Sequence, residues 1–268
     1  MTNLPALFAE MVCRTFGLGQ PDDGSRVGSG ANVVWRLATS TGDYVVKELP
    51  MQRRHALIEA ASFEYAAWRA DLLPMPEPRP DRDGALVAVL PGSRGIPAAV
   101  RVHRHAPGRA IRKDRLFAGK AGYALATIQN FGTGWVHTGP AERLWSTTDR
   151  QVLNRFRQRW PDLRLGSADR VLAQAQRLAN SAQPHALVFS HADHKPENCL
   201  AQHGNLLLTL DWDEAGTCEP RAEAVESALR WSWTAAGGPD PVVFASFVDG
   251  YRSADRPFPP IRECDWAG

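Results

Sequence analysis

Along the chain, stretches in which apolar residues have the spacing of β-strands alternate with stretches in which they have the spacing of helices. Strands dominate the first part. Residues 4–16 have helical spacing and end at the turn-forming run GLGQPDDGS. The runs ANVVWRLAT and YVVKEL flank the turn STGD and predict a β-hairpin. Residues 55–72 predict a helix, which the prolines of LPMPEPRP end, and ALVAVL and AVRVHRH predict two further strands.

Helical spacing dominates after residue 108. It covers five stretches, namely residues 116–130, 148–160, 167–182, 221–233 and 241–251. The apolar runs ALVFSH and NLLLTLDW predict strands on either side of the polar stretch ADHKPENC. We therefore expect an α+β fold with two lobes. A β-rich lobe with one main helix is expected over residues 1–105, and a mostly helical lobe over residues 106–268.

The composition is that of a globular protein. A hydrophobic content of 44 % in 268 residues is enough for a sizeable core. No run approaches the roughly 18–20 apolar residues that span a bilayer, and the first residues lack the basic flank and cleavage site of a signal peptide. The cysteines Cys13, Cys199, Cys218 and Cys264 form no C-x-x-C pair. We expect a cytoplasmic protein with reduced thiols and no membrane partner.

The net charge is only +2, but it is unevenly distributed. From Asp211 onward the sequence has eleven acidic residues and five arginines, a net charge of −6, which leaves +8 for residues 1–210. Carboxylates that line a pocket hold ammonium groups and attract them from solution. The acidic segment therefore predicts a cationic small-molecule substrate.

Residue types that phosphoryl transfer needs occur in the order that the reaction requires. A glycine-containing loop enters the hairpin, where backbone N–H groups can approach a phosphate. Its residues are Gly28, Ser29 and Gly30. Lys47 lies in an apolar strand, where an ammonium group needs a carboxylate partner. Glu64 and Glu59 on the next helix are the two candidates, and because they point about 140° apart around the helix, both cannot face the lysine equally well.

The polar stretch between the later strands supplies a second set of groups. Asp193 precedes Asn198 by five residues, and Pro196 stiffens the loop between them. An aspartate can accept the proton of an attacking hydroxyl, and an amide oxygen can bind a hard cation. Asp211 ends the run NLLLTL, so its carboxylate, the Asn198 amide and phosphate oxygens together predict a magnesium site, which Asp213 could also approach.

The motif HADHKPEN, followed by LDWDEAG, resembles the H-x-D-x-x-x-x-N and D-x-D signature of the aminoglycoside phosphotransferase and choline-kinase-like family, relatives of protein kinases. The resemblance covers most of the chain and implies the two-lobed protein-kinase-like fold. It implies that ATP or GTP binds with Mg²⁺ in a cleft near residues 100–109, with His105 as a contact. By matching position it assigns Asp193 as catalytic base, Asn198 and Asp211 as magnesium ligands, Lys47 as the phosphate-pairing lysine and Glu64 as its partner.

The chain departs from the family pattern at several positions. Ala192 stands where the family has a glycine, Gln129 where a histidine is common, and Val33 in place of a third loop glycine. The family's acid in the next helix is a glutamate here, which leaves the substrate side open. The candidate substrate-binding residues, besides Asp193, are Glu223, Glu226 and Trp231. Large aromatic residues are core residues first, so a core position for the tryptophan is the alternative.

These features predict a small-molecule kinase that transfers the γ-phosphoryl group to a hydroxyl of a cationic antibiotic, either an aminoglycoside or a basic peptide, and so confers resistance. A kinase of choline, an amino alcohol or a sugar is the alternative within the enzyme class. An inactive nucleotide-binding scaffold is the alternative outside it. We expect no nucleic-acid partner and a monomer or homodimer.

Two other interpretations compete for single segments. His191, His194, Cys199 and His203 have a spacing that could close a tetrahedral zinc site. The segment RAIRKDR could mark a basic nucleic-acid module, although a solvated helix face explains it as well.

Overall fold

The computed structural model describes residues 3–27, 32–135, 187–202, 205–235 and 238–254. The chain forms two compact units, Met1–Pro107 and Gly108–Gly268, so the division lies two residues after the predicted lobe boundary. The glycine loop, Gly28 to Gly30, and the helices predicted at residues 148–160 and 167–182 lie outside the described residues. The functions predicted for the two lobes stay predictions.

An antiparallel sheet forms the centre of the first unit. Its strands are β1 Pro21–Arg26, β2 Val33–Thr39, β3 Gly42–Leu49, β4 Pro78–Arg79, β5 Ala88–Pro91 and β6 Pro97–Arg104. They lie in the order β1-β2-β3-β6-β4, with β5 on β6. The predicted hairpin is β2 and β3, in which Thr39 is paired with Gly42. The two helices of this unit are α1 Ala6–Phe16 and α2 Arg54–Arg69.

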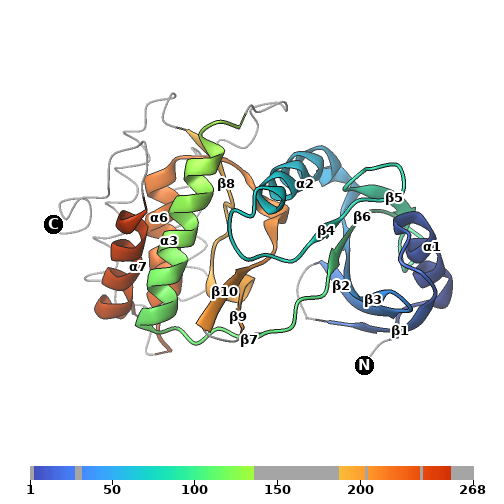
Figure 1. The fold of residues 1–268 in the computed structure, drawn as a ribbon, viewed down its shortest axis with the longest axis horizontal. Coiled ribbons are helices and arrows are strands. Elements are labelled where there is room, and N and C mark those ends of the chain that lie inside the picture. The colour runs from blue at the N-terminus through green and yellow to red at the C-terminus, as the bar shows by residue number, and fades with distance from the viewer. Residues whose placement is uncertain (1–2, 28–31, 136–186, 203–204, 236–237, 255–268) are drawn as a thin grey trace. The chain divides into compact units, whose positions relative to one another are not determined.

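The two faces of this sheet are covered by different helices (Figure 1). Because side chains alternate along a strand, even-numbered positions of β3 and β6 point to one face and odd-numbered positions to the other. Val46 and Val102 belong to the core that α1 closes. Leu49 and Ala99 pack with Leu57 of α2 instead. Odd-numbered residues of these strands therefore lie on the α2 side of the sheet.

The second unit combines short strands with long helices. Its elements are β7 Arg109–Ala110, α3 Arg115–Gly132, β8 Val188–Ser190, β9 Cys199–Gln202, β10 Leu206–Thr209, β11 Gly216–Cys218, α6 Pro220–Ser232 and α7 Pro241–Ser253. One small sheet has the order β10-β9-β7, and β8 pairs with β11. In the hairpin of β9 and β10, Cys199, which follows the polar loop, is paired with Thr209, which lies just before Asp211.

Helices α3, α6 and α7 lie side by side in this unit and share one apolar core (Figure 1). Asp114 caps α3 by accepting a hydrogen bond from the N–H of Phe117, and Asp240 caps α7 in the same way. Glycines allow the closest contacts: a Cβ at Gly122 would lie 1.9 Å from the Phe247 carbonyl oxygen. Among the described residues, no helix has the length and apolar character that crossing a membrane requires.

Candidate active site

Asp193 lies in the loop between β8 and β9, and three donors surround its carboxylate. Oδ2 accepts hydrogen bonds from Lys195 Nζ at 2.5 Å and from Asn198 Nδ2 at 2.9 Å. Oδ1 accepts one from Arg230 Nη1 at 3.0 Å. Bonds from cations to a carboxylate are among the stronger hydrogen bonds in proteins. The structure thus brings the predicted residues Asp193 and Asn198 into contact and adds two cations beside them.

The strands β9 and β10 set the positions of Asn198 and Asp211. The N–H of Leu210 donates to the Asn198 carbonyl oxygen at 2.8 Å, and Asp211 follows directly. Asp211 has a left-handed backbone with φ of 62°, a conformation that costs a residue with a Cβ about 1–2 kcal/mol. One amide oxygen and one carboxylate form a donor set suited to Mg²⁺, which usually keeps waters and takes further oxygens from phosphates. The residues therefore fit the predicted ion.

A buried carboxylate on α6 supports this loop. Glu223 accepts the N–H of Ala192 on Oε1 at 2.7 Å. Its Oε2 accepts the Gln129 side-chain amide at 2.8 Å and the Cys218 thiol at 3.2 Å. Glu223 is buried and engaged within the protein, so its observed contacts hold the residue before Asp193. A contact with substrate stays a prediction for it.

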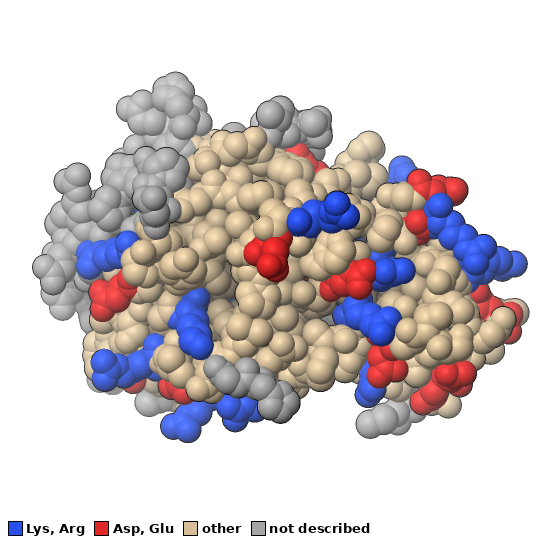
Figure 2. Space-filling view, viewed as in Figure 1, with Lys and Arg blue, Asp and Glu red and all other residues tan. Residues whose placement is uncertain are grey.

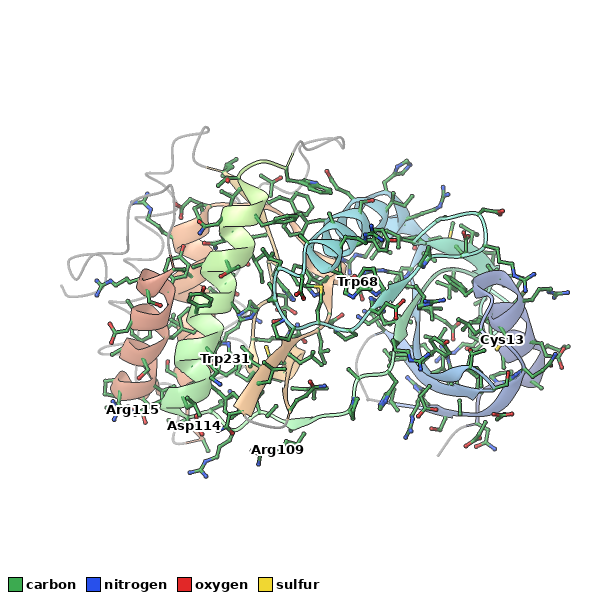
Figure 3. The ribbon with its side chains drawn as sticks, in the orientation of Figure 1. Cys13, Trp68, Arg109, Asp114, Arg115 and Trp231 are labelled. Atoms are coloured by element: carbon green, nitrogen blue, oxygen red, sulfur yellow. The ribbon has the colours of Figure 1, made fainter. Side chains whose placement is uncertain are left out.

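An aromatic layer lies around the same loop. The Nε2–H of His191 donates to the Leu210 carbonyl oxygen at 2.8 Å, and the His191 ring lies 4.8 Å from Trp212. His194 stacks on Trp231 at 6.3 Å between ring centroids. Burial, with the nearby His191, lowers the pKa of His194 well below its ordinary value, so this ring is neutral. Trp231 is fully buried in the helical core (Figure 3), and in this structure its ring is not exposed to a substrate.

The remaining candidate on α6, Glu226, is paired inside the protein. Its Oε1 accepts from Arg230 Nη2 at 2.5 Å, one helical turn further on. Burial raises the pKa of Glu226, with Asp193 and Glu223 adding to this effect and Arg230 opposing it. Burial by itself lowers the pKa of Arg230, but the carboxylates of Glu226 and Asp193 raise it above its ordinary value. A guanidinium thus links the proposed base to a second carboxylate.

The described residues give little support to the zinc site or to the basic nucleic-acid module. Those residues contain no group of three or more His, Cys, Asp or Glu able to hold a metal ion, and His203 lies outside them. In the segment RAIRKDR, Arg112 Nε lies 3.9 Å from Asp114 Oδ2. Figure 3 labels Asp114 and, in the same segment, Arg109 and Arg115. On the face shown in Figure 2, positive and negative side chains are interspersed.

In the first unit, Glu64 on α2 reaches the odd-numbered side chains of the sheet. It forms an ion pair with Arg101 and a hydrogen bond with His103 Nε2 at 3.1 Å. Lys47 is paired with Arg101 across β3 and β6. Burial by itself raises the pKa of Glu64, but the charges of Arg101, His103 and Lys47 together lower it to about 2. The predicted pair therefore lies in a larger charged cluster, and the choice between Glu64 and Glu59 as the partner of Lys47 stays open.

His105 follows β6, and its N–H donates to the Asp43 carbonyl oxygen at 2.9 Å. Its predicted contact with a nucleotide stays a prediction.

The model of the phosphotransferase enzyme family (APH) matches residues 23–260. The chain belongs to this family. The match covers most of both units and confirms the resemblance drawn from HADHKPEN and LDWDEAG. It also confirms the predicted enzyme class, since members of the family are phosphotransferases.

Solved structures with the same fold include kinases of small molecules. Spectinomycin phosphotransferase APH(9)-Ia, in complex with ADP and spectinomycin, is 14 % identical over 95 % of this chain and 81 % of its own, with a TM-score of 0.63. The amicoumacin kinase hAmiN, in complex with AMP-PNP, Ca²⁺ and Ami, is 15 % identical over 93 % and 78 %, with a TM-score of 0.68. A microcompartment-associated aminopropanol kinase is 17 % identical over 93 % and 81 %, with a TM-score of 0.66.

At these identities the likeness shows the fold, and it confirms the predicted protein-kinase-like α+β architecture. No curated protein sequence matches the chain.

Several residues that the structure places in these clusters were not predicted from the sequence. Arg101 and His103 alternate within AVRVHRH, and this spacing of two in a strand predicts that they share one face. Arg230 follows Glu226 by four residues, which is the spacing of a helical ion pair. Its bond to Asp193, 37 positions away, has no signal in the sequence.

Proposed function

We propose that this phosphotransferase transfers the γ-phosphoryl group of ATP or GTP to a hydroxyl of a hydroxylated antibiotic that also carries amine groups. The observation that carries the proposal is the contact between Asp193 and Asn198. Asp211 directly follows Leu210, whose N–H donates to the Asn198 carbonyl oxygen. A carboxylate for the proton and two oxygen ligands for a cation are the groups that this reaction needs.

In the proposed step, Asp193 accepts the proton of the acceptor hydroxyl. The acceptor oxygen then forms a bond to the γ-phosphorus, and the bond from that phosphorus to the bridging oxygen breaks, releasing the nucleoside diphosphate. Lys195 and Asn198 hold the Asp193 carboxylate in place through Oδ2. Oδ1 has bonding capacity left for the hydroxyl, because an ionised carboxylate oxygen accepts about two hydrogen bonds.

Asn198 and Asp211 would hold the magnesium ion of the nucleotide. When bound, the ion neutralises charge on the phosphates. Lys47 would pair with phosphate oxygens from its rigid strand, next to the Glu64 cluster. The nucleotide complexes of the spectinomycin and amicoumacin kinases support the binding of a nucleoside triphosphate by this chain.

The spectinomycin and Ami bound in the same two structures support an antibiotic as the acceptor. The acidic character of the last segment gives weaker support than the sequence suggests, because several of its carboxylates are engaged internally. Glu219 pairs with Arg221, Glu226 pairs with Arg230, and Asp240 caps a helix. The aminopropanol kinase keeps a metabolic amino alcohol as the second candidate acceptor.

A panel of acceptors tests the proposal. The purified protein, with MgATP or MgGTP, would be incubated with aminoglycosides, spectinomycin, basic peptide antibiotics, choline, amino alcohols and sugars, and phosphorylated products would be detected by mass spectrometry. We expect a phosphorylated antibiotic. Product only from choline or an amino alcohol would favour the metabolic kinase, and nucleotide binding without any product would favour the scaffold.

A further inference from the structure

Arg230 occupies an unusual place for a helical ion-pair residue. An ordinary surface pair on α6 would need only Glu226, which lies one turn earlier on the same helix. The guanidinium instead reaches across to the polar loop and also bonds to Asp193 Oδ1 at 3.0 Å. Two carboxylates hold the guanidinium, and 29 % of the Arg230 side chain is exposed, which leaves part of the side chain open to a ligand.

The hydrogen bonds around Asp193 decide where an acceptor hydroxyl can bind. Oδ2 already accepts from Lys195 and Asn198, which together use its bonding capacity. Among the described residues, only Arg230 donates to Oδ1, so Oδ1 can accept one more hydrogen bond. The reacting hydroxyl and the Arg230 guanidinium therefore donate to the same atom, Asp193 Oδ1. The substituent on the carbon next to that hydroxyl then lies within reach of Arg230.

The chemistry of the guanidinium restricts what that substituent can be. Arginine offers several N–H donors in a fixed plane and no acceptor, and its bonds to Asp193 and Glu226 use two of them. An oxygen of the acceptor can take up a further donor. An ammonium group there would have like charge and would also be a donor, so it could form no hydrogen bond with Arg230.

Displacement of Arg230 by a substrate ammonium is the other way to use this pair of carboxylates. It would take a guanidinium away from both Asp193 and Glu226 at once, at a place where the charges are partly buried. Removing one partner from a pair of buried charges is costly. Lys113 also holds the helix here, because its Nζ donates to the Arg230 carbonyl oxygen at 3.2 Å. The observed contacts therefore favour a guanidinium that stays in place.

We propose that Arg230 is a specificity-determining residue that selects acceptors whose reacting hydroxyl has an oxygen substituent, and not an ammonium group, on the neighbouring carbon. This inference rests on the proposed function and narrows its acceptor. Amine groups elsewhere in the acceptor are compatible with it. It separates this chain from a kinase of simple vicinal amino alcohols.

Matched pairs of acceptors test the inference. D-glucose with D-glucosamine, and 1,2-propanediol with 1-amino-2-propanol, differ by one hydroxyl and one amine next to a hydroxyl. They would be assayed together with the antibiotic panel, and kcat/KM would be measured for the wild type, Arg230→Gln and Arg230→Lys. Arg36→Gln is the matched control, because Arg36 forms an exposed ion pair with Asp43 in the first unit. Thermal unfolding would show that the variants fold.

We expect the wild type to favour acceptors with the oxygen neighbour by at least about tenfold in kcat/KM. The preference should fall towards unity in Arg230→Gln, persist in part in Arg230→Lys and be unchanged in Arg36→Gln. A purely structural ion pair would lower the rates for both members of a pair together. A wild type that prefers the ammonium neighbour, or an Arg230→Gln variant with the wild-type ratio, overturns the inference.

Failure of the proposed phosphoryl transfer itself gives a different result. In that case the wild type would form no phosphorylated product from any compound of the panel, and the inference would fall with it. Products from the wild type without a change of ratio in Arg230→Gln would leave the proposed function standing and remove the role of Arg230 alone.

Discussion

Two buried glutamates show how neighbouring charges decide the pKa of a carboxyl group. Burial raises the pKa of both Glu64 and Glu226. Glu64 has Arg101, His103 and Lys47 around it, and its pKa falls to about 2. Glu226 has one arginine, and two nearby carboxylates add to the effect of burial, so its pKa is raised. The number and sign of the neighbours, and not burial alone, set the outcome.

The Glu64 cluster predicts a stability effect that can be measured. Glu64→Gln removes the negative partner of the buried Arg101, and we expect a loss of about 3–5 kcal/mol of unfolding free energy in urea titrations at neutral pH. The double variant Glu64→Leu with Arg101→Met removes both charges and should recover most of this loss. Equal losses in the single and double variants would contradict this interpretation.

The same carboxylate predicts the direction of a pH effect. Its pKa is about 2 in the folded protein, against 4.5 as the ordinary value. The stabilisation is therefore fully present above pH 4.5 and is lost as the pH falls towards 2. Unfolding free energies measured across this range should decline less steeply in Glu64→Gln than in the wild type. Parallel declines would show that other groups dominate.

The backbone of Ala192 predicts a substitution that keeps or raises the stability of the fold, in contrast to the loss expected for Glu64→Gln. Its φ of 59° is left-handed, a region that glycine enters without a steric cost. Ala192→Gly should therefore leave stability unchanged or raise it by up to about 1–2 kcal/mol, although glycine also gains entropy in the unfolded chain. Thermal and urea unfolding would measure this change. A clear loss of stability would mean that the buried methyl group contributes more by packing than its backbone strain costs.

At the scale of elements, glycines set how closely the helices of the second unit approach one another. A Cβ on Gly122 of α3 would lie 1.9 Å from the Phe247 carbonyl oxygen and 2.7 Å from the Tyr251 nitrogen, both on α7. Backbone atoms cannot move aside as a flexible side chain can. Gly119 on the same helix has only the Ser246 oxygen at 3.4 Å from such a Cβ.

This difference predicts the result of two matched substitutions. Gly122→Ala should destabilise the fold by about 1–3 kcal/mol or more, because the two helices must separate. Gly119→Ala should be neutral or stabilising by up to about 1 kcal/mol, since alanine favours a helix over glycine. Urea unfolding of both variants measures the difference. Similar effects at the two positions would show that helix propensity, and not packing, decides the outcome.

The sequence predicted the longer elements well and the short strands poorly. The hairpin of β2 and β3 and the helices α2, α3, α6 and α7 follow from their periodicity. The segment PDDGSR, predicted as part of a turn, forms β1, because its backbone pairs with β2 at the sheet edge. Likewise, β9 and β11 are too short for a periodic pattern and are defined by their partner strands.

In the candidate site, contacts within one loop could be predicted from the sequence, whereas contacts between distant segments could not. The spacing of Asp193 and Asn198 within one loop predicted residues that the structure brings into contact. Contacts between segments far apart in the sequence were not predictable in the same way. Glu223 supports Ala192 from 31 positions away, and Arg230 reaches Asp193 from 37 positions away. Sequence separations of this length are not related to the periodicity of a helix or a strand, so no pattern in the sequence indicates these contacts.

At the scale of the whole molecule, the family match covers most of the chain, and the proposed site residues are distributed over both units. Lys47 and Glu64 belong to the first unit, whereas Asp193, Asn198 and Asp211 belong to the second. Each unit has its own apolar core, and Asp193 belongs to neither, so its substitution can be tested for an effect on activity with little expected effect on folding.

The most direct test of the central claim is the rate of phosphoryl transfer by Asp193→Asn, measured with the best acceptor of the panel. Asparagine keeps the shape of the side chain but cannot take up the hydroxyl proton. We predict that kcat falls roughly 10²–10⁴-fold, while the protein remains folded and still binds nucleotide. A folded Asp193→Asn variant that keeps kcat within about threefold of the wild type would show that Asp193 is not the general base.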